Sequence, residues 1–429
     1  MAFATPAVLA EKVSSLLLDK RSSAPDICAV TRLFEVMYCC SISREESEVI
    51  SFHVVYIDPD NPDPNPPPER LPDNWHLYKL ESPVAVNLPN IRKLAPATDP
   101  RSSALAVYHD ENGQPMVYGF VDQLNSYEDF INLETGSGQR RPGLFEARII
   151  GPGHIAVSID YERIAELKVS EITDSKIDVL ESGPIHQILY PGVEQVVKEL
   201  QSKHGAVGER TCDLVELYWF SCLKRILIRM QNLRHGGALL IVPDDSAEGL
   251  NIKFGFKYDR LHSAILTYCS HLHEYTDFHK RMDSDNEFDI DKSAMRKWYI
   301  EQLYWKKPHS KQELKATIWL ISLLTRIDGL VLLSPQLDVL GFGCEIKVSE
   351  EPNIIKKALT SKAEPSSRVD ISYQHYGTRH RSMMRYCNKF PGSIGLVVSQ
   401  DGDVRAMTKI DSDVCIWENV RLQLEIESD

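Results

Sequence analysis

Apolar and polar residues alternate over short stretches in the first part of the chain, which is typical of strands. Two runs between residues 31 and 57, LFEVMYCCSI and EVISFHVVYI, are rich in β-branched and aromatic residues and predict strands. Before them, residues 1–22 carry an apolar stripe at helical spacing that also contains Glu11, Lys12 and Asp19. This stretch therefore predicts an amphipathic N-terminal helix.

Short strands separated by turns continue as far as residue 159. The sequence from Asp110 to Gly113 favours a hairpin turn, and the GPG at 151–153 forms another turn. The proline-rich stretch 58–72 can form neither a helix nor the interior of a sheet, because successive prolines lack donors and fix φ. The expected strands are Ala104–Tyr108, Met116–Val121, Leu144–Ile150 and Ile155–Ile159. The sequence therefore predicts a β-rich domain over residues 23–190.

Helical spacing becomes the main pattern from about residue 191. The expected helices are Val193–His204, Cys212–Leu233, Leu261–Lys280, Ala294–Tyr304, Gln312–Arg326 and Thr378–Asn388. A buried strand is expected after the glycines in Gly236–Pro243, and the other expected strands are Leu330–Leu333, Val339–Ile346, Ile394–Val398, Val404–Met407 and Val414–Trp417. Helices that alternate with short apolar strands are typical of a layered α/β domain with a mixed sheet. We therefore expect an α/β (α+β) two-domain protein whose second domain spans residues 200–425.

The composition limits the classes of protein to which the chain can belong. A length of 429 residues with 43% hydrophobic and 25% charged residues fits an ordinary globular protein of two or three domains. The formal net charge of −13 argues against a general binder of nucleic acid or of membrane surfaces. No apolar run approaches the ~18 residues of a membrane-spanning helix, and the N-terminus lacks the basic stretch of a signal peptide. The nine cysteines show no C-x-x-C pair, so we expect reduced thiols and a cytoplasmic protein.

Residues 371–400 run against this acidic balance, because they contain no Asp or Glu. The basic residues there are Arg379, Arg381, Arg385 and Lys389, together with His375 and His380. Gly377 and Thr378 precede the arginines and open a helical pattern. Arginine forks bind phosphate oxygens in a bidentate way, and a helix N-terminus adds free N–H groups. The window favours a phosphate site; the alternative is a solvated basic helix end.

Two patterns that resemble metal sites are set aside. Alternate acidic residues from Asp283 to Asp291 imitate a calcium loop, but Phe288 stands where a glycine is needed and Ala294 where a bidentate Glu is needed. His271 and His273 point to different faces of the expected helix, which favours an ordinary polar helix surface over a metal site.

Several motifs in chain order resemble the diadenylate cyclase domain, the family that condenses two ATP molecules into cyclic di-AMP. The hallmark pair of that family is an Asp-Gly-Ala and a Gly-Thr-Arg-His-Arg. Here Asp328-Gly329-Leu330 stands for the first, and residues 377–381 match the second. The likeness covers residues 205–420, except for an insertion at 260–310. The layout also resembles that of the DACNV group of sensor proteins, which implies a sensor or regulatory role for the domain at 23–190.

The resemblance implies roles for individual residues. Asp328, His380 and Arg381 would be catalytic, and Asp328 and His380 would hold Mg²⁺ or Mn²⁺. ATP would be the substrate or ligand, and the partner of each active site would be a second copy in a homodimer or higher even oligomer. The residues implied in nucleotide binding are Gly329, Leu330, Gly343, Gly377, Thr378, Arg379, Arg381 and Ser399.

Departures from the family pattern leave three functions open. Leu330 replaces the small alanine beside the nucleotide, and Ile327 stands where some members place a metal-binding histidine. The chain would be a diadenylate cyclase controlled by its N-terminal domain, a cyclase-derived nucleotide sensor without catalysis, or an interaction scaffold without a nucleotide. The retained Asp328 favours the first, and Leu330 favours the second.

Overall fold

The computed structural model describes residues 3–20, 25–45, 48–62, 75–98, 103–123, 144–159, 162–173, 177–244, 247–284, 297–298, 301–400, 402–422 and 424. The described residues up to 173 form one compact unit, and those from 177 onward form a second. Each unit combines helices with a mixed sheet. The predicted α+β fold of two domains is therefore confirmed.

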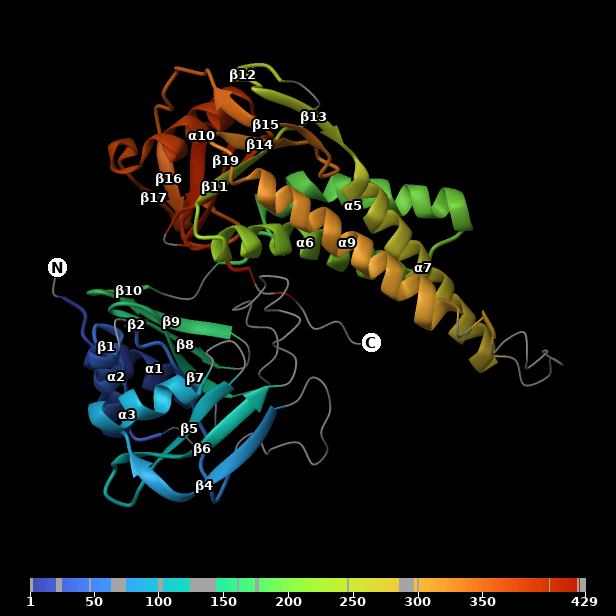
Figure 1. Cartoon of the computed structure of the whole chain (residues 1–429). Helices are drawn as coiled ribbons and strands as arrows, with labels where there is room; N and C mark the ends of the chain where they lie inside the picture. The colour runs from blue at the N-terminus through green and yellow to red at the C-terminus, as the bar shows by residue number, and fades with distance from the viewer. Residues whose placement is uncertain are drawn as a thin grey trace. The chain divides into compact units, whose positions relative to one another are not determined.

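The first unit is built on an eight-stranded sheet with the order β10-β9-β8-β7-β3-β5-β6-β4 (Figure 1). Its strands are β3 (His53–Tyr56), β4 (Trp75–Ala85), β5 (Ser103–His109), β6 (Pro115–Gln123), β7 (Phe145–Gly151), β8 (His154–Ile159), β9 (Glu162–Lys168) and β10 (Glu171–Thr173). Neighbours are antiparallel except β3 and β5, which are parallel. The short strands β1 (Arg44–Glu45) and β2 (Glu48–Val49) form a separate pair.

The main core of this unit lies between the sheet and its helices. Apolar side chains of α1 (Pro6–Lys20) and α2 (Ile27–Ser41) pack against strand residues such as Val54, Leu105 and Val157. Ile91 of the short helix α3 (Leu88–Leu94) joins the same core. A smaller apolar cluster that includes Val55 and Ala106 lies on the opposite face of the sheet.

The strand predicted from LFEVMYCCSI is wrong, because most of this run lies in helix α2. Asp26 caps the helix, since its carboxylate accepts a hydrogen bond from the amide of Ala29 at 3.1 Å. The buried residues recur every three to four positions and are Ala29, Val30, Leu33, Phe34, Met37, Cys40 and Ser41. A continuous apolar run is compatible with either structure, and packing against the sheet and α1 selects the helix. Cys39 and Cys40 therefore lie in a helix, the first exposed and the second buried.

The other predictions for the first unit are largely confirmed. Strands β5 to β8 lie where they were expected, and Gly113 takes a φ of +69° in the turn between β5 and β6. Gly153 makes the turn between β7 and β8 with a φ of +65°. The sequence pattern did not reveal α3, β4, β9 or β10. The stretch 58–72 is described only as far as residue 62.

The second unit is built on a ten-stranded sheet with the order β12-β15-β14-β11-β18-β19-β20-β16-β17, in which β13 also pairs with β15. Strands β11 and β14 are parallel, as are β16 and β20, and the other neighbours are antiparallel. The strands are β11 (Gly237–Ile241), β12 (Leu250–Asn251), β13 (Phe254–Tyr258), β14 (Leu330–Leu333), β15 (Val339–Ile346), β16 (Ile355–Ala358), β17 (Arg368–Asp370), β18 (Ile394–Val398), β19 (Val404–Ile410) and β20 (Asp413–Trp417).

Helices cover both faces of this sheet, which makes a three-layer arrangement. Four helices, α5 (Pro184–His204), α6 (Glu209–Asn232), α7 (Arg260–Ser284) and α9 (Lys307–Leu324), lie together on one face (Figure 1). Helix α10 (Thr378–Lys389) covers the other face. Successive residues of each central strand alternate between the two cores, as a period of two requires.

The helices and strands expected in the second domain are confirmed, with one exception. The expected helix Ala294–Tyr304 lies partly outside the described residues, and its described end shows a π-helical turn at Gln302–Lys306. Most of the acidic stretch from 283 to 291 also lies outside them. Within the described part of the chain, no helix is both long enough and apolar enough to span a membrane.

Candidate functional site

Three strand ends meet at one edge of the second unit's sheet, and predicted site residues lie at two of them. Strand β14 begins directly after Asp328 and Gly329, and it runs parallel to β11. Strand β18 is antiparallel to β11, so that its last residue, Val398, pairs with the first residue of β11, Gly237. The starts of β11 and β14 therefore lie beside the end of β18, which Ser399 follows. The fold brings Asp328, Gly329 and Ser399 to the same edge, called the motif edge below.

A close approach of two backbones explains the glycines at this edge. Gly329 has a φ of +114°, and a Cβ atom there would lie 2.6 Å from the carbonyl carbon of Gly343. Gly343 itself has a φ of +64°. Side chains are disfavoured at both positions, because positive φ and lack of space act together. The glycines let the turn before β14 lie against β15, while the side chain of Asp328 remains exposed.

Leu330 belongs to the core and is only 6% exposed. Its side chain lies in the apolar cluster under α10 with Ala238, Cys344 and Met383. The extra volume relative to alanine is therefore accommodated by packing between sheet and helix.

Helix α10 begins at the motif edge. Its N-cap residue is Gly377, which makes no side-chain capping bond, and Thr378 and Arg379 are exposed. The guanidinium Nη1 of Arg379 lies 3.3 Å from the position that a Cβ of Gly236 would take. Gly236 precedes β11 and has a φ of +70°. The side chain of Arg379 thus reaches back from the helix start across the strand ends.

His380 is held by an arginine from a neighbouring strand. Arg405 of β19 donates a hydrogen bond from Nη1 to Nε2 of His380 over 3.1 Å. Burial lowers the pKa of His380 to about 4, and the positive charges of Arg405 and Arg379 act in the same direction. The imidazole is therefore neutral near pH 7, with Nε2 as an acceptor and the proton on Nδ1.

Two further arginines of α10 flank this pair. The guanidinium of Arg381 lies over the ring of Tyr373, 5.8 Å from its centre, and the Tyr373 hydroxyl donates to the carbonyl of Arg381 over 3.4 Å. Arg385 donates from Nη2 to the Oγ of Ser382 over 3.0 Å. The Nε atoms of Arg381, Arg385 and Arg405 are buried, and none has a hydrogen-bond partner within the described part of the chain.

The arginines at the motif edge form no direct ion pairs with described residues. Across the described ranges, no ion pair involves any of the four guanidinium groups, which belong to Arg379, Arg381, Arg385 and Arg405. Glu418 lies nearby but accepts from the Tyr376 hydroxyl over 2.8 Å and pairs with Lys357. Burial alone would raise the pKa of Glu418, but these two donors lower it, and the charge of Arg405 acts in the same direction. Its carboxylate is therefore ionised, and its direct partners are Tyr376 and Lys357.

The residues present do not fit the metal site that the family resemblance implies. Asp328 and His380 were expected to share a divalent cation, but Nε2 of His380 accepts from Arg405. Nor does the described part of the chain hold any group of three or more His, Cys, Asp or Glu side chains suited to a metal. His271 and His273 are bonded instead to Ser310 and Thr211, at 3.2 and 3.3 Å.

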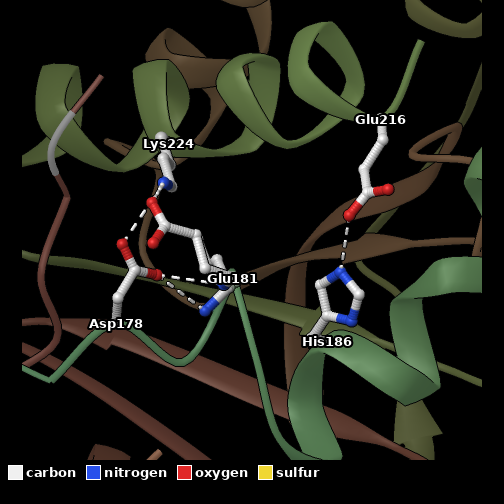
Figure 2. A network of polar contacts seen from close by, with 6 residues as sticks. Asp178, Glu181, His186, Glu216 and Lys224 are labelled. Atoms are coloured by element: carbon white, nitrogen blue, oxygen red, sulfur yellow. Dashed lines mark hydrogen bonds and ion pairs between the residues drawn. The ribbon is translucent and has the colours of Figure 1, made fainter. Parts of the chain in front are cut away.

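A second polar cluster lies at the entry of the chain into this unit (Figure 2). Lys224 of α6 is 4% exposed and pairs with Asp178 at 3.3 Å and Glu181 at 2.9 Å. Beside it, His186 of α5 bonds Glu216 of α6 at 3.0 Å. Each carboxylate in the cluster has a hydrogen-bonding or ionic partner. We interpret the cluster as a structural tie between residues 178–186 and α6.

Sequence reasoning missed Arg405, Tyr373 and Tyr376. Arg405 lies five residues beyond the acid-free window 371–400 and follows Asp401 and Asp403. Its role depends on the contact between α10 and β19, which the sequence does not reveal. The acid-free window did identify Arg379, Arg381 and Arg385.

Comparison with known proteins gives one finding. Residues 19–122 match the family described as "Probable sensor domain DACNV". This range runs from the end of α1 to β6 and lies within the first unit. No curated protein and no solved structure matches the chain. The predicted likeness to the DACNV group is confirmed, and residues 19–122 are similar to its probable sensor domain.

Proposed function

We propose that the second unit binds a nucleotide at the motif edge, and that the chain is a nucleotide sensor derived from the diadenylate cyclase domain. The main support is the set of four guanidinium groups without ionic partners in the described residues, gathered where α10 begins. Three of the four side chains are half-buried, where unpaired charge is costly, and a polyphosphate would supply a counter-charge. The DACNV-like segment of the first unit would read or control this binding.

ATP and cyclic di-AMP are the two nucleotides to which the proposal commits. Both present several phosphate oxygens, and each charge-assisted hydrogen bond is worth about 1.5–3 kcal/mol. The phosphates would lie over the start of α10, between Arg379 and Arg381. The free N–H groups of the first helical turn would add to the attraction.

Calorimetry with the full chain tests this function. Wild-type protein should bind ATP or cyclic di-AMP, and the Arg379→Ala/Arg381→Ala double variant should lose at least tenfold in affinity while its melting temperature stays unchanged. Arg260→Ala is the matched control, because this arginine is exposed on α7 and paired with Glu313. Absence of nucleotide binding by wild-type protein would leave the interaction scaffold as the remaining function. Equal affinity in the double variant would remove the motif edge as the binding site.

Synthesis of cyclic di-AMP is the second candidate, favoured by the exposed Asp328 at the same edge. In that reaction each ribose 3′-hydroxyl attacks the α-phosphate of the other ATP, and pyrophosphate leaves. Asp328 would accept the hydroxyl proton, while Arg379 and Arg381 would hold the phosphates. Each chain supplies one nucleotide, so two copies must face each other in a homodimer or higher even oligomer.

Product analysis separates the enzyme from the sensor. Protein incubated with ATP and Mn²⁺ is analysed by mass spectrometry, with light scattering to record its oligomeric state. An enzyme makes the cyclic dinucleotide as an even oligomer and loses the product in Asp328→Asn, which still binds ATP. A sensor makes none, and Leu330→Ala, which restores the family's small residue, makes none either.

A further inference from the structure

We propose that Arg405 is an anion-binding residue of the motif edge and supplies the positive charge that a divalent cation would otherwise bring. The inference rests on the proposed nucleotide binding and goes beyond it in one respect. It states that the phosphates bind without a metal ion.

The position of Arg405 places its charge at the start of α10. The residue lies on β19, where its backbone pairs with Val397 of β18. Its side chain donates to Nε2 of His380 over 3.1 Å. The ring of Tyr376 lies against the guanidinium, with its centre 5.9 Å from Cζ. The guanidinium of Arg405 thus lies beside the helix turn that also carries Arg379 and Arg381.

The hydrogen bond from Arg405 uses the ring nitrogen that a metal would need. A neutral imidazole has one protonated nitrogen and one lone pair. Since Nε2 accepts from Arg405, Nδ1 carries the proton, and neither nitrogen is left to bind a cation. A divalent ion beside Nε2 would also meet the positive charge of Arg405 at close range. His380 therefore serves to orient Arg405.

Arg405 itself still has unused donors. Nη1 bonds His380, but Nε is buried with no partner in the described part of the chain. The nearby carboxylate of Glu418 is bonded to Tyr376 and Lys357, and Arg405 acts on it through charge without a direct ion pair. A guanidinium carries five N–H donors in a planar fork, so the group can hold His380 and a phosphate oxygen together.

The alternative is that Arg405 only supports the shape of the site, by holding His380 and Tyr376. The two roles differ in their response to metal. A merely structural arginine leaves any need for Mg²⁺ unchanged when it is replaced. An arginine that stands in for the cation creates a need for Mg²⁺ when it is removed, because Nε2 of His380 becomes free.

The test is calorimetry of the full chain with ATP, in EDTA and in excess Mg²⁺. Wild-type affinity should agree within about threefold between the two conditions. Arg405→Met should lose about ten- to a hundredfold in EDTA, as expected for lost charge-assisted bonds, and should regain part of it in Mg²⁺. Arg405→Lys keeps the charge without the fork and should show an intermediate loss, which provides a second variant if Arg405→Met does not fold.

Each contrary result has a distinct meaning. Wild-type binding that requires Mg²⁺ would overturn the role of Arg405 and leave nucleotide binding in place. If Arg405→Met or Arg405→Lys binds ATP in EDTA as tightly as wild-type protein does, the proposed role of Arg405 is overturned too. Absence of ATP binding under both conditions would remove the proposed ATP site, and with it this inference.

Discussion

Arg379 and Arg381 lie two residues apart on α10, yet their surroundings differ. Arg379 is exposed, and its guanidinium extends toward Gly236. Arg381 is half-buried, lies over Tyr373, and keeps an Nε without a partner in the described residues. Water competes less for a half-buried donor, so a phosphate gains more from Arg381.

The expected outcome for Arg381→Ala is a loss of about ten- to a hundredfold in ATP affinity, corresponding to about 1.5–3 kcal/mol for one charge-assisted bond. Arg379→Ala should lose less ATP affinity, because the hydrogen bond of Arg379 to a phosphate would be exposed to water. Calorimetry on both folded variants, beside Arg260→Ala, measures the order. A larger loss in Arg379→Ala would contradict the burial argument.

Some of the site residues could be identified from the sequence, because their signal lies in neighbouring residues. Absence of acidic residues from 371 to 400 pointed to Arg379, Arg381 and Arg385, because this signal needs only neighbouring residues. Arg405 and His380 are 25 residues apart and meet only when α10 packs on β19. No local pattern encodes that contact.

Helices and strands of the second unit were predictable where the apolar period was clear. Strands β11, β14 and β18 are short apolar runs between breaks, and α6 and α7 show long helical spacing. The strand predicted over α2 was wrong, because a fifteen-residue apolar segment with aromatic residues suits either structure until its partners are known. Strand β4 was missed because its exposed residues break the alternation, with only Trp75 fully buried.

Gly192 marks a close contact of α5 with its surroundings. A Cβ there would lie 2.4 Å from the carbonyl oxygen of Pro335 and 2.7 Å from the Trp219 ring. Gly192→Ala should therefore lower the free energy of unfolding of the second unit by about 1–2 kcal/mol, since overpacking outweighs the helix propensity gained. Denaturant unfolding measures the change. Gly255→Ala is the control, because nothing lies within 4 Å of its Cβ position; equal stability of the two variants would contradict the contact.

At the scale of the whole molecule, the first segment of the second unit is held to the rest of that unit by a backbone bridge and by ion pairs. Ile177 forms a parallel bridge with Val420, two residues beyond Glu418. Asp178 and Glu181 then pair with Lys224 (Figure 2). Burial raises the pKa of Asp178 to about 6, although Lys224 opposes the shift. For Glu181, burial would raise the pKa, but Lys224 lowers it.

These opposite shifts predict opposite effects of pH on stability. The raised pKa of Asp178 contributes stability below its ordinary value of 3.8, and this contribution is lost as pH rises through about 6. Asp178→Asn should therefore gain unfolding free energy relative to wild type between about pH 4 and pH 7. The lowered pKa of Glu181 contributes stability above pH 4.5 that is lost as pH falls. The free energy of unfolding of Glu181→Gln should therefore fall relative to that of wild type as pH rises from acid. Chemical denaturation across this range tests both, and parallel pH profiles would contradict the assignment.

Hydrogen exchange with and without ATP tests the central claim, that the second unit binds a nucleotide at the motif edge, most directly. The first amides of a helix have no intrahelical acceptor and exchange quickly unless a ligand covers them. Saturating ATP should slow exchange at Thr378–His380 and at Gly236–Gly237, and Arg379→Ala/Arg381→Ala should abolish the effect. Unchanged exchange at both segments, or slowing confined to other parts of the chain, would contradict the account.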